Sequence, residues 1–247
     1  MRTANPALNE NTFLNVHDQA YGGQSMTIEG TVSKSGILLM LVMASAAFTW
    51  RGYLNGSEQV MLWMIGGLIG GLVFGLVTSF KPAIAMYTAP VYALCEGLFL
   101  GGVSAQAQVM SGQAIVIQAV TLTFGILLAL LFVYRIGLIK ATENFKLGVA
   151  AATGGIFLAY LATIVLGLFG ITVPFIHQTG AIGIGFSLFV VVVASLNLVL
   201  DFDFIENGAE RGAPKYMEWY AAFGLMVTLI WLYLEILRLL SKLQSRR

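Results

Sequence analysis

The stretch VMLWMIGGLIGGLVFGLVTSF, residues 60–80, carries no charged side chain and is long enough to cross the hydrocarbon core of a bilayer as a helix. Six further apolar stretches occur along the chain, at residues 36–50, 83–103, 114–134, 147–169, 180–200 and 221–240. The polar–apolar alternation that is typical of membrane barrel strands is absent from them. The sequence therefore predicts an all-α membrane protein, a seven-transmembrane-helix bundle.

The composition agrees with a lipid environment. The chain has 247 residues, of which 58% are hydrophobic and 10% are charged, whereas a soluble domain carries about 25% charged residues. The net charge of +1 gives no basic surface for nucleic acid. The single Cys95 excludes an intrachain disulfide and a cysteine-rich metal centre. We expect no resident cofactor.

The chain ends are polar. Residues 1–33 form a tail with no apolar signal-peptide core, residues 34–242 form the transmembrane domain, and residues 243–247 form a basic C-terminal tail. The N-terminal side of a seven-span protein would hold Arg2, Lys34, Lys81, Arg135, Lys140, Lys146, Arg211 and Lys215. The opposite side would hold Arg51, Arg238, Lys242, Arg246 and Arg247. The excess of basic residues favours a cytoplasmic N-terminus.

Glycines recur at helical spacing in two of the predicted spans. They are Gly66, Gly67, Gly70, Gly71, Gly75, Gly97 and Gly101. Small residues four apart let helix backbones approach closely. The pattern favours tight packing within the bundle, and a dimer interface is the alternative.

Acidic residues lie at the end of the sixth predicted span. Asp201 directly follows an apolar run, whereas Asp203 and Glu206 lie further along and fit a solvated helix end as well as a functional one. Asn197, one turn before Asp201, is a candidate hydrogen-bond partner inside the bundle. Asp201 is thus the strongest functional candidate of the three acids.

Two more acids lie within apolar spans. Glu235 has apolar neighbours on both sides, and Arg238 follows three residues later on the same helix face. Glu235 is therefore either a salt-bridged helix-end residue or an inward-facing carboxylate. Glu96 has no basic residue within one turn, so burial favours its neutral form. It is either a proton-sensing group or a neutral hydrogen-bond donor.

Four segments resemble a known family. SLNLVLDFDFI at residues 195–205 and WLYLEILRLL at residues 231–240 are similar to the last two helices of the Bax inhibitor-1/YccA family. NPALNENTF at residues 5–13 and GAPKYMEWY at residues 212–220 resemble a bacterial subgroup, which implies a bacterial plasma membrane. The resemblance extends over essentially all seven spans. It implies a bundle in which the last helix is central and surrounded by the other six.

The resemblance also implies roles for two acids. Asp201 takes the place of the sixth-helix aspartate of the family's acidic pair, and Glu235 takes the place of the seventh-helix aspartate. In relatives this pair is linked to pH-sensitive calcium leakage, and other relatives restrain cell death or modulate a membrane protease. Here the seventh-helix acid is glutamate and the connection is longer than is typical. The two acids can meet only if residues near 208–220 stand outside the membrane.

We therefore expect a pH-sensitive calcium or cation leak channel that is gated by a buried carboxyl pair. Two neighbouring carboxyls in a low dielectric cannot both ionise easily, and the released carboxylates of Asp201 and Glu235 would offer hard oxygen ligands to Ca²⁺. The alternative is a non-transporting interaction protein that modulates a membrane protease or stress response through its tail. An enzyme is not expected, because the chain has no His-Glu-x-x-His motif and no Gly-x-Ser-x-Gly motif.

Overall fold

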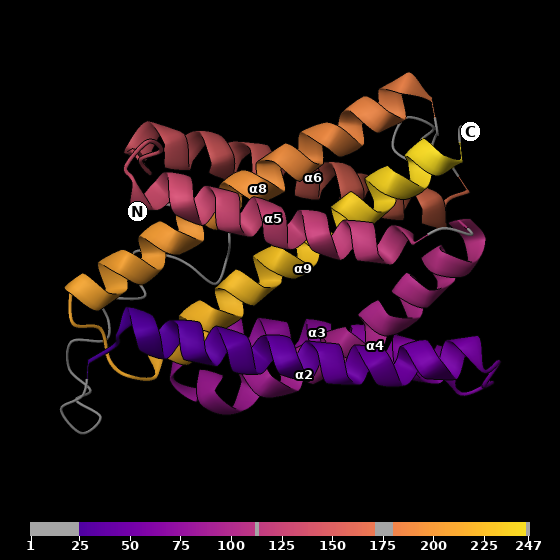
Figure 1. Ribbon diagram of the computed structural model, residues 1–247, viewed down its shortest axis with the longest axis horizontal. Helices are drawn as coiled ribbons and strands as arrows, with labels where there is room; N and C mark the ends of the chain where they lie inside the picture. Colours follow the sequence, from indigo (N-terminus) through magenta and orange to yellow (C-terminus); the bar gives the residue numbers. More distant parts are fainter. Residues whose placement is uncertain (1–24, 112–113, 171–179, 246–247) are drawn as a thin grey trace. The chain divides into compact units, whose positions relative to one another are not determined.

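The computed structural model describes residues 25–111, 114–170 and 180–245. Its described part contains seven helices that are long and apolar enough to cross a membrane, and it contains no strand (Figure 1). They are α2 (Ile28–Leu54), α3 (Val60–Phe80), α4 (Ala85–Ser111), α5 (Ile115–Arg135), α6 (Glu143–Leu168), α8 (Ala181–Glu210) and α9 (Met217–Gln244). A short 3-10 turn, η1 (Pro82–Ile84), leads into α4. The predicted all-α, seven-span class is confirmed.

Several helices extend beyond the predicted spans, and the start of α2 and the end of α8 are two of the largest differences. α2 begins at Ile28, before the predicted start at residue 36, because the Thr27 hydroxyl caps the helix by accepting a hydrogen bond from the Gly30 amide at 3.0 Å. Residues 28–33 of the expected tail are therefore helical. α8 continues to Glu210, beyond the predicted end at residue 200, because Phe202, Phe204 and Ile205 extend its buried face.

Some sequence predictions concern residues outside the described part. These are residues 1–24 of the N-terminal tail, including Arg2, and the last residues Arg246 and Arg247.

The chain folds as two compact units. Among the described residues, the first, here called the α2–α4 unit, comprises residues 25–111 and 203–227. The second, the α5–α6 unit, comprises residues 114–170, 180–202 and 228–245. α8 and α9 each contribute one part to each unit. Asp201 of α8 and Glu235 of α9, the acids predicted as a pair, both belong to the α5–α6 unit.

In the α2–α4 unit, glycines of α3 and α4 lie at the contacts between neighbouring helices. Gly97 of α4 lies against Val42 and Ser45 of α2, and Gly67 of α3 lies against Cys95 of α4. Because a side chain at either glycine would overlap the neighbouring helix, these glycines permit close approach of the backbones. The predicted role of glycine in packing within the bundle is confirmed for these positions.

The α5–α6 unit has a core shared by three helices. Ile156 of α6 packs with Val190 and Val193 of α8, and Trp231 of α9 packs against this group. α5 joins through Tyr134, whose ring centroid lies 5.8 Å from that of Phe202 on α8. Within this unit α5, α6 and α8 run alongside one another (Figure 1).

α9 is the most buried of the seven spans. In the most apolar 18-residue segment of each helix, the buried share is 56% for α9, 50% for α8 and 39% or less for the other helices.

Candidate functional site

Two acids of the α5–α6 unit are almost completely buried. Asp201 of α8 is 1% exposed and Glu235 of α9 is 2% exposed. A carboxyl group in the interior of a membrane protein is costly unless its surroundings stabilise it. Both residues were singled out by the sequence, and their burial makes them the core of the candidate site.

Glu235 lies in a charged cluster. Tyr160 of α6 donates its hydroxyl to the two carboxylate oxygens at 3.0 and 3.1 Å, and Arg238 Nη1 donates to them at 2.9 and 3.0 Å. Arg238 also donates to the Tyr160 oxygen at 2.5 Å, and its guanidinium lies 5.0 Å from the centroid of that ring. The predicted salt bridge to Arg238 is confirmed, and the carboxylate is inward-facing as well. Tyr160 was not identified from the sequence.

The register of α8 against α9 places Asp201 and Glu235 at different levels of the helix pair. Lys242 of α9 lies beside Ser187 of α8, and Trp231 packs near Val190, so the two helices run antiparallel. Glu235 is seven residues from Lys242, and Asp201 is fourteen residues from Ser187. At 1.5 Å per residue, the Lys242 contact offsets the acids by about 10 Å along the helices and the Trp231 contact offsets them by about 20 Å, so about 10 Å is the smallest offset.

This offset bears on calcium binding. Ca²⁺ takes six to eight oxygen ligands at about 2.3–2.6 Å, so carboxyls about 10 Å apart cannot chelate one ion. In the described part of the chain, no cluster of three or more His, Cys, Asp or Glu side chains could hold a metal. In this conformation Asp201 and Glu235 are separate groups at two levels of one helix pair.

Asn197 lies between these two levels. Its side-chain amide donates to the Thr153 hydroxyl of α6 at 2.9 Å and to the Val193 carbonyl at 2.9 Å. The sequence predicted an interior hydrogen bond for Asn197, and the structure supplies Thr153 as its partner. Polar groups thus occur at successive levels from Asp201 through Asn197 to Glu235.

The other predicted acids lie in the α2–α4 unit. Glu96 is half-buried and its carboxyl lies over Gly71 of α3, with no hydrogen bond or ion pair to any residue that the structure describes. Asp203 is half-buried and Glu206 is exposed, and both lie within α8 rather than beyond its end.

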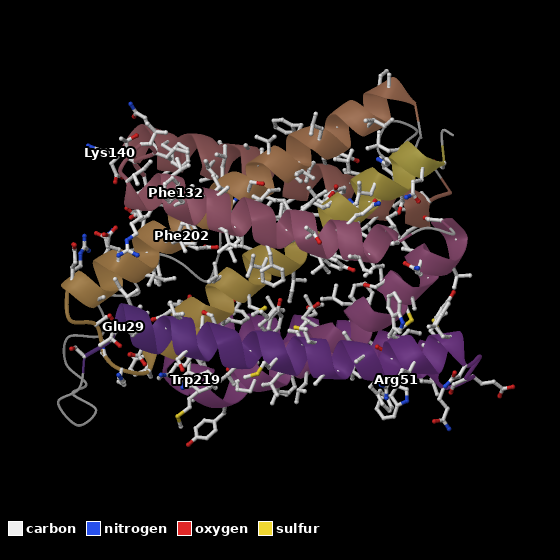
Figure 2. The ribbon with its side chains drawn as sticks, in the orientation of Figure 1. Glu29, Arg51, Phe132, Lys140, Phe202 and Trp219 are labelled. Carbon is white, nitrogen blue, oxygen red and sulfur yellow. The ribbon has the colours of Figure 1, made fainter. Side chains whose placement is uncertain are left out.

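One buried acid was missed by the sequence analysis. Glu218, at the start of α9, is 0% exposed. It accepts hydrogen bonds from the Thr27 amide and hydroxyl, each at 2.9 Å, and forms ion pairs with Lys34 and with Lys215, the latter at 2.9 Å. Only the i, i+3 spacing of Lys215 and Glu218 signalled this cluster in the sequence. The Lys34 ammonium also lies 5.7 Å from the Trp219 ring centroid, and Figure 2 shows Trp219 beside the start of α2.

Lys242 was predicted only as part of a basic flank. Its ammonium group instead reaches across to α8, where it donates to the Ser187 hydroxyl at 2.9 Å and to the Gly183 carbonyl at 3.1 Å. Lys242 is 7% exposed. A lysine this deeply buried requires such partners.

Comparison with known proteins gives one match. Residues 5–245, nearly the whole chain, match the family model described as Bax inhibitor 1 like. No curated protein and no solved structure matches the chain.

Proposed function

Because this chain belongs to the Bax inhibitor 1 like family, we propose that it forms a pH-sensitive leak pathway for calcium or other cations, with Asp201 and Glu235 as its proton-binding groups. The observation that carries the proposal is the almost complete burial of both carboxyls in one unit of a seven-span protein. Burying an acid so deep within a membrane span costs free energy, and acids at such positions commonly mark pathways for ions or protons.

The contacts of Glu235 suggest how a proton would act. The carboxylate holds Arg238 of its own helix and Tyr160 of α6. Protonation removes the negative charge that neutralises the guanidinium, so the link between α6 and the end of α9 weakens. The proposed gate is therefore the contact of α9 with α6, and acidification loosens it.

Asp201 acts at a different level of the same pathway in this proposal. The offset of about 10 Å is too large for the two carboxyls to share one proton directly. Asn197 and Thr153 supply polar groups at an intermediate level. A cation moving along α8 would meet Asp201 and Glu235 in succession, each as an oxygen ligand in its ionised form.

The test is cation flux in reconstituted liposomes across a range of pH. Asp201→Asn and Glu235→Gln are expected to flatten the pH dependence of calcium flux, because each removes a titrating group with little change of shape. Glu206→Gln is the matched control, since Glu206 is an exposed acid on the same helix as Asp201. Flux that keeps its wild-type pH profile in both buried-site variants would contradict the proposed gate.

A second candidate is a non-transporting protein that binds a membrane protease or another membrane protein. The observation in its favour is that Ser25 and Met26, which lie within the polar tail, attach to the α8–α9 turn. Ser25 forms a bridge to Pro214, and the Met26 amide donates to the Ala213 carbonyl at 2.6 Å. A partner that binds the tail would thus act close to the start of α9. Absence of flux, together with a partner whose co-purification needs residues 1–24, would favour this candidate.

We also propose a cytoplasmic N-terminus in a bacterial plasma membrane. The seven-span arrangement assigns eight basic residues to the N-terminal side and five to the opposite side, and basic residues are in excess on the cytoplasmic side of membrane proteins. A phosphatase fused after residue 247 is expected to be active, because that enzyme needs the oxidising exterior. Activity only in fusions to the N-terminus or to the α8–α9 turn would reverse the orientation.

A further inference from the structure

We propose that the Lys242 ammonium group occupies a binding site for a monovalent cation, formed by oxygens at the start of α8, and acts there as a tethered cation. The site itself follows from the contacts of Lys242. Lys242 in this site would close one end of the pathway to ions, and that consequence rests on the proposed function.

The geometry resembles coordination more than a surface contact. Lys242 lies in the last turns of α9, and its Nζ atom is held 2.9 Å from the Ser187 hydroxyl oxygen and 3.1 Å from the Gly183 carbonyl oxygen. Ser187 is 1% exposed, so both groups lie inside the protein. The long side chain carries its charge from α9 into the neighbouring helix rather than out to solvent.

Carbonyl and hydroxyl oxygens are the ligands by which membrane proteins hold partly dehydrated alkali cations. An ammonium group binds to the same kinds of oxygen, because it carries one positive charge and donates up to three hydrogen bonds. If the lysine side chain is shortened, the same oxygens and the vacated volume remain. A free sodium or potassium ion can then take the place of the ammonium group.

The local charge explains why the tethered cation would obstruct a mobile one. Glu235, Arg238 and Lys242 lie on one face of α9, at spacings of three and four residues. Glu235 and Arg238 are the charged residues nearest to Lys242 along α9, and residues 147–168 of α6 and 181–200 of α8 carry no charged side chain. One acid and two basic residues give a net charge of +1, which repels an approaching cation. Without Lys242 the remaining pair is neutral.

The binding site is tested by thermal unfolding of the purified full chain in lipid nanodiscs, in sodium, potassium or choline chloride at equal ionic strength. Lys242→Ala is expected to unfold at a higher temperature in sodium or potassium than in choline, which is too large for the site. Wild type and the control Lys140→Ala are expected to show no such difference, because Lys140 is exposed in the α5–α6 connection (Figure 2). Adding Ser187→Ala to Lys242→Ala is expected to abolish the cation effect.

A purely structural role for Lys242 gives a different result. The Lys242→Ala variant would then lose stability equally in all three salts, and the proposed site would be wrong. Ethylammonium provides a second measurement, since it replaces the missing end of the side chain and is expected to raise the unfolding temperature of Lys242→Ala more than that of wild type. If Lys242→Ala cannot be purified, Lys242→Met keeps the unbranched chain without the charge, and the same comparison with choline applies.

Flux separates this inference from the proposed function. In liposomes Lys242→Ala is expected to raise sodium and potassium leak roughly tenfold, which corresponds to a barrier lower by about 1.4 kcal/mol. Cation-dependent stability without flux in any variant would support the site and contradict the pathway. Increased flux without cation-dependent stability would contradict the site and leave the pathway standing.

Discussion

Replacing Gly97 with alanine is expected to lower the free energy of unfolding by about 2–3 kcal/mol, the usual cost of forcing extra volume into a packed interior. An added methyl group at Gly97 would overlap the Val42 carbonyl oxygen and the Ser45 hydroxyl of α2. The carbonyl belongs to a helix backbone and cannot turn aside, so α2 and α4 must separate. Gly101→Ala is expected to behave in the same way, because it would meet the Ala46 carbonyl and Thr49.

Two neighbouring glycines serve as matched controls. A methyl group at Gly66 meets nothing within 4 Å, so Gly66→Ala is expected to be neutral or stabilising by up to about 1 kcal/mol, as alanine favours helix. The atoms nearest to a methyl group at Gly102 belong to the flexible side chain of Met64, so Gly102→Ala is expected to cost less than Gly97→Ala. Thermal unfolding in lipid nanodiscs ranks the four variants. Equal losses at Gly66 and Gly97 would show that the contact of α2 with α4 does not depend on close backbone approach.

Local features of the sequence were sufficient to predict the membrane spans. The bounds of α3 match the predicted stretch because apolar composition and helix length coincide there. The sequence did not predict the extension of α8 past residue 200, because hydropathy falls at Asp201 while the buried face continues through Phe202 and Ile205. Average hydropathy along the sequence identifies segments that are apolar on all sides. It does not detect a helix of which a single face is covered by protein.

The difference between local sequence pattern and helix packing also explains which contacts of the candidate site were predictable. The Glu235–Arg238 pair was predictable because its spacing of three residues fixes both groups on one helix face. The Tyr160 contact joins residues 75 apart and the Lys34 contact joins residues 184 apart. Contacts at such separations depend on how helices pack and leave no local pattern. The expectation that Asp201 and Glu235 act as a pair came from family resemblance, and the register of α8 against α9 places them at different levels.

Replacing Glu218 with alanine is the other change expected to have a large effect, about 3–5 kcal/mol, because it removes the acid from a buried, paired cluster. Lys34 and Lys215 would lose their counter-charge, and the Thr27 amide and hydroxyl would lose their acceptor. Glu218→Gln is expected to cost less, since the amide oxygen can still accept from Thr27. Thermal unfolding gives the total cost, and hydrogen exchange of the first turns of α2 shows where it arises.

The control for Glu218 is Glu58, a glutamate that lies exposed between α2 and α3. Glu58→Ala is expected to change stability by no more than about 0.5 kcal/mol, as for most surface positions. Lys34→Met is expected to cost less in the Glu218→Ala background than in wild type, because the ion pair has already gone. Additive effects of these two substitutions would show that Lys34 and Glu218 stabilise the protein independently. The capped start of α2 would then be held by Thr27 and the Met26–Ala213 bond rather than by charge.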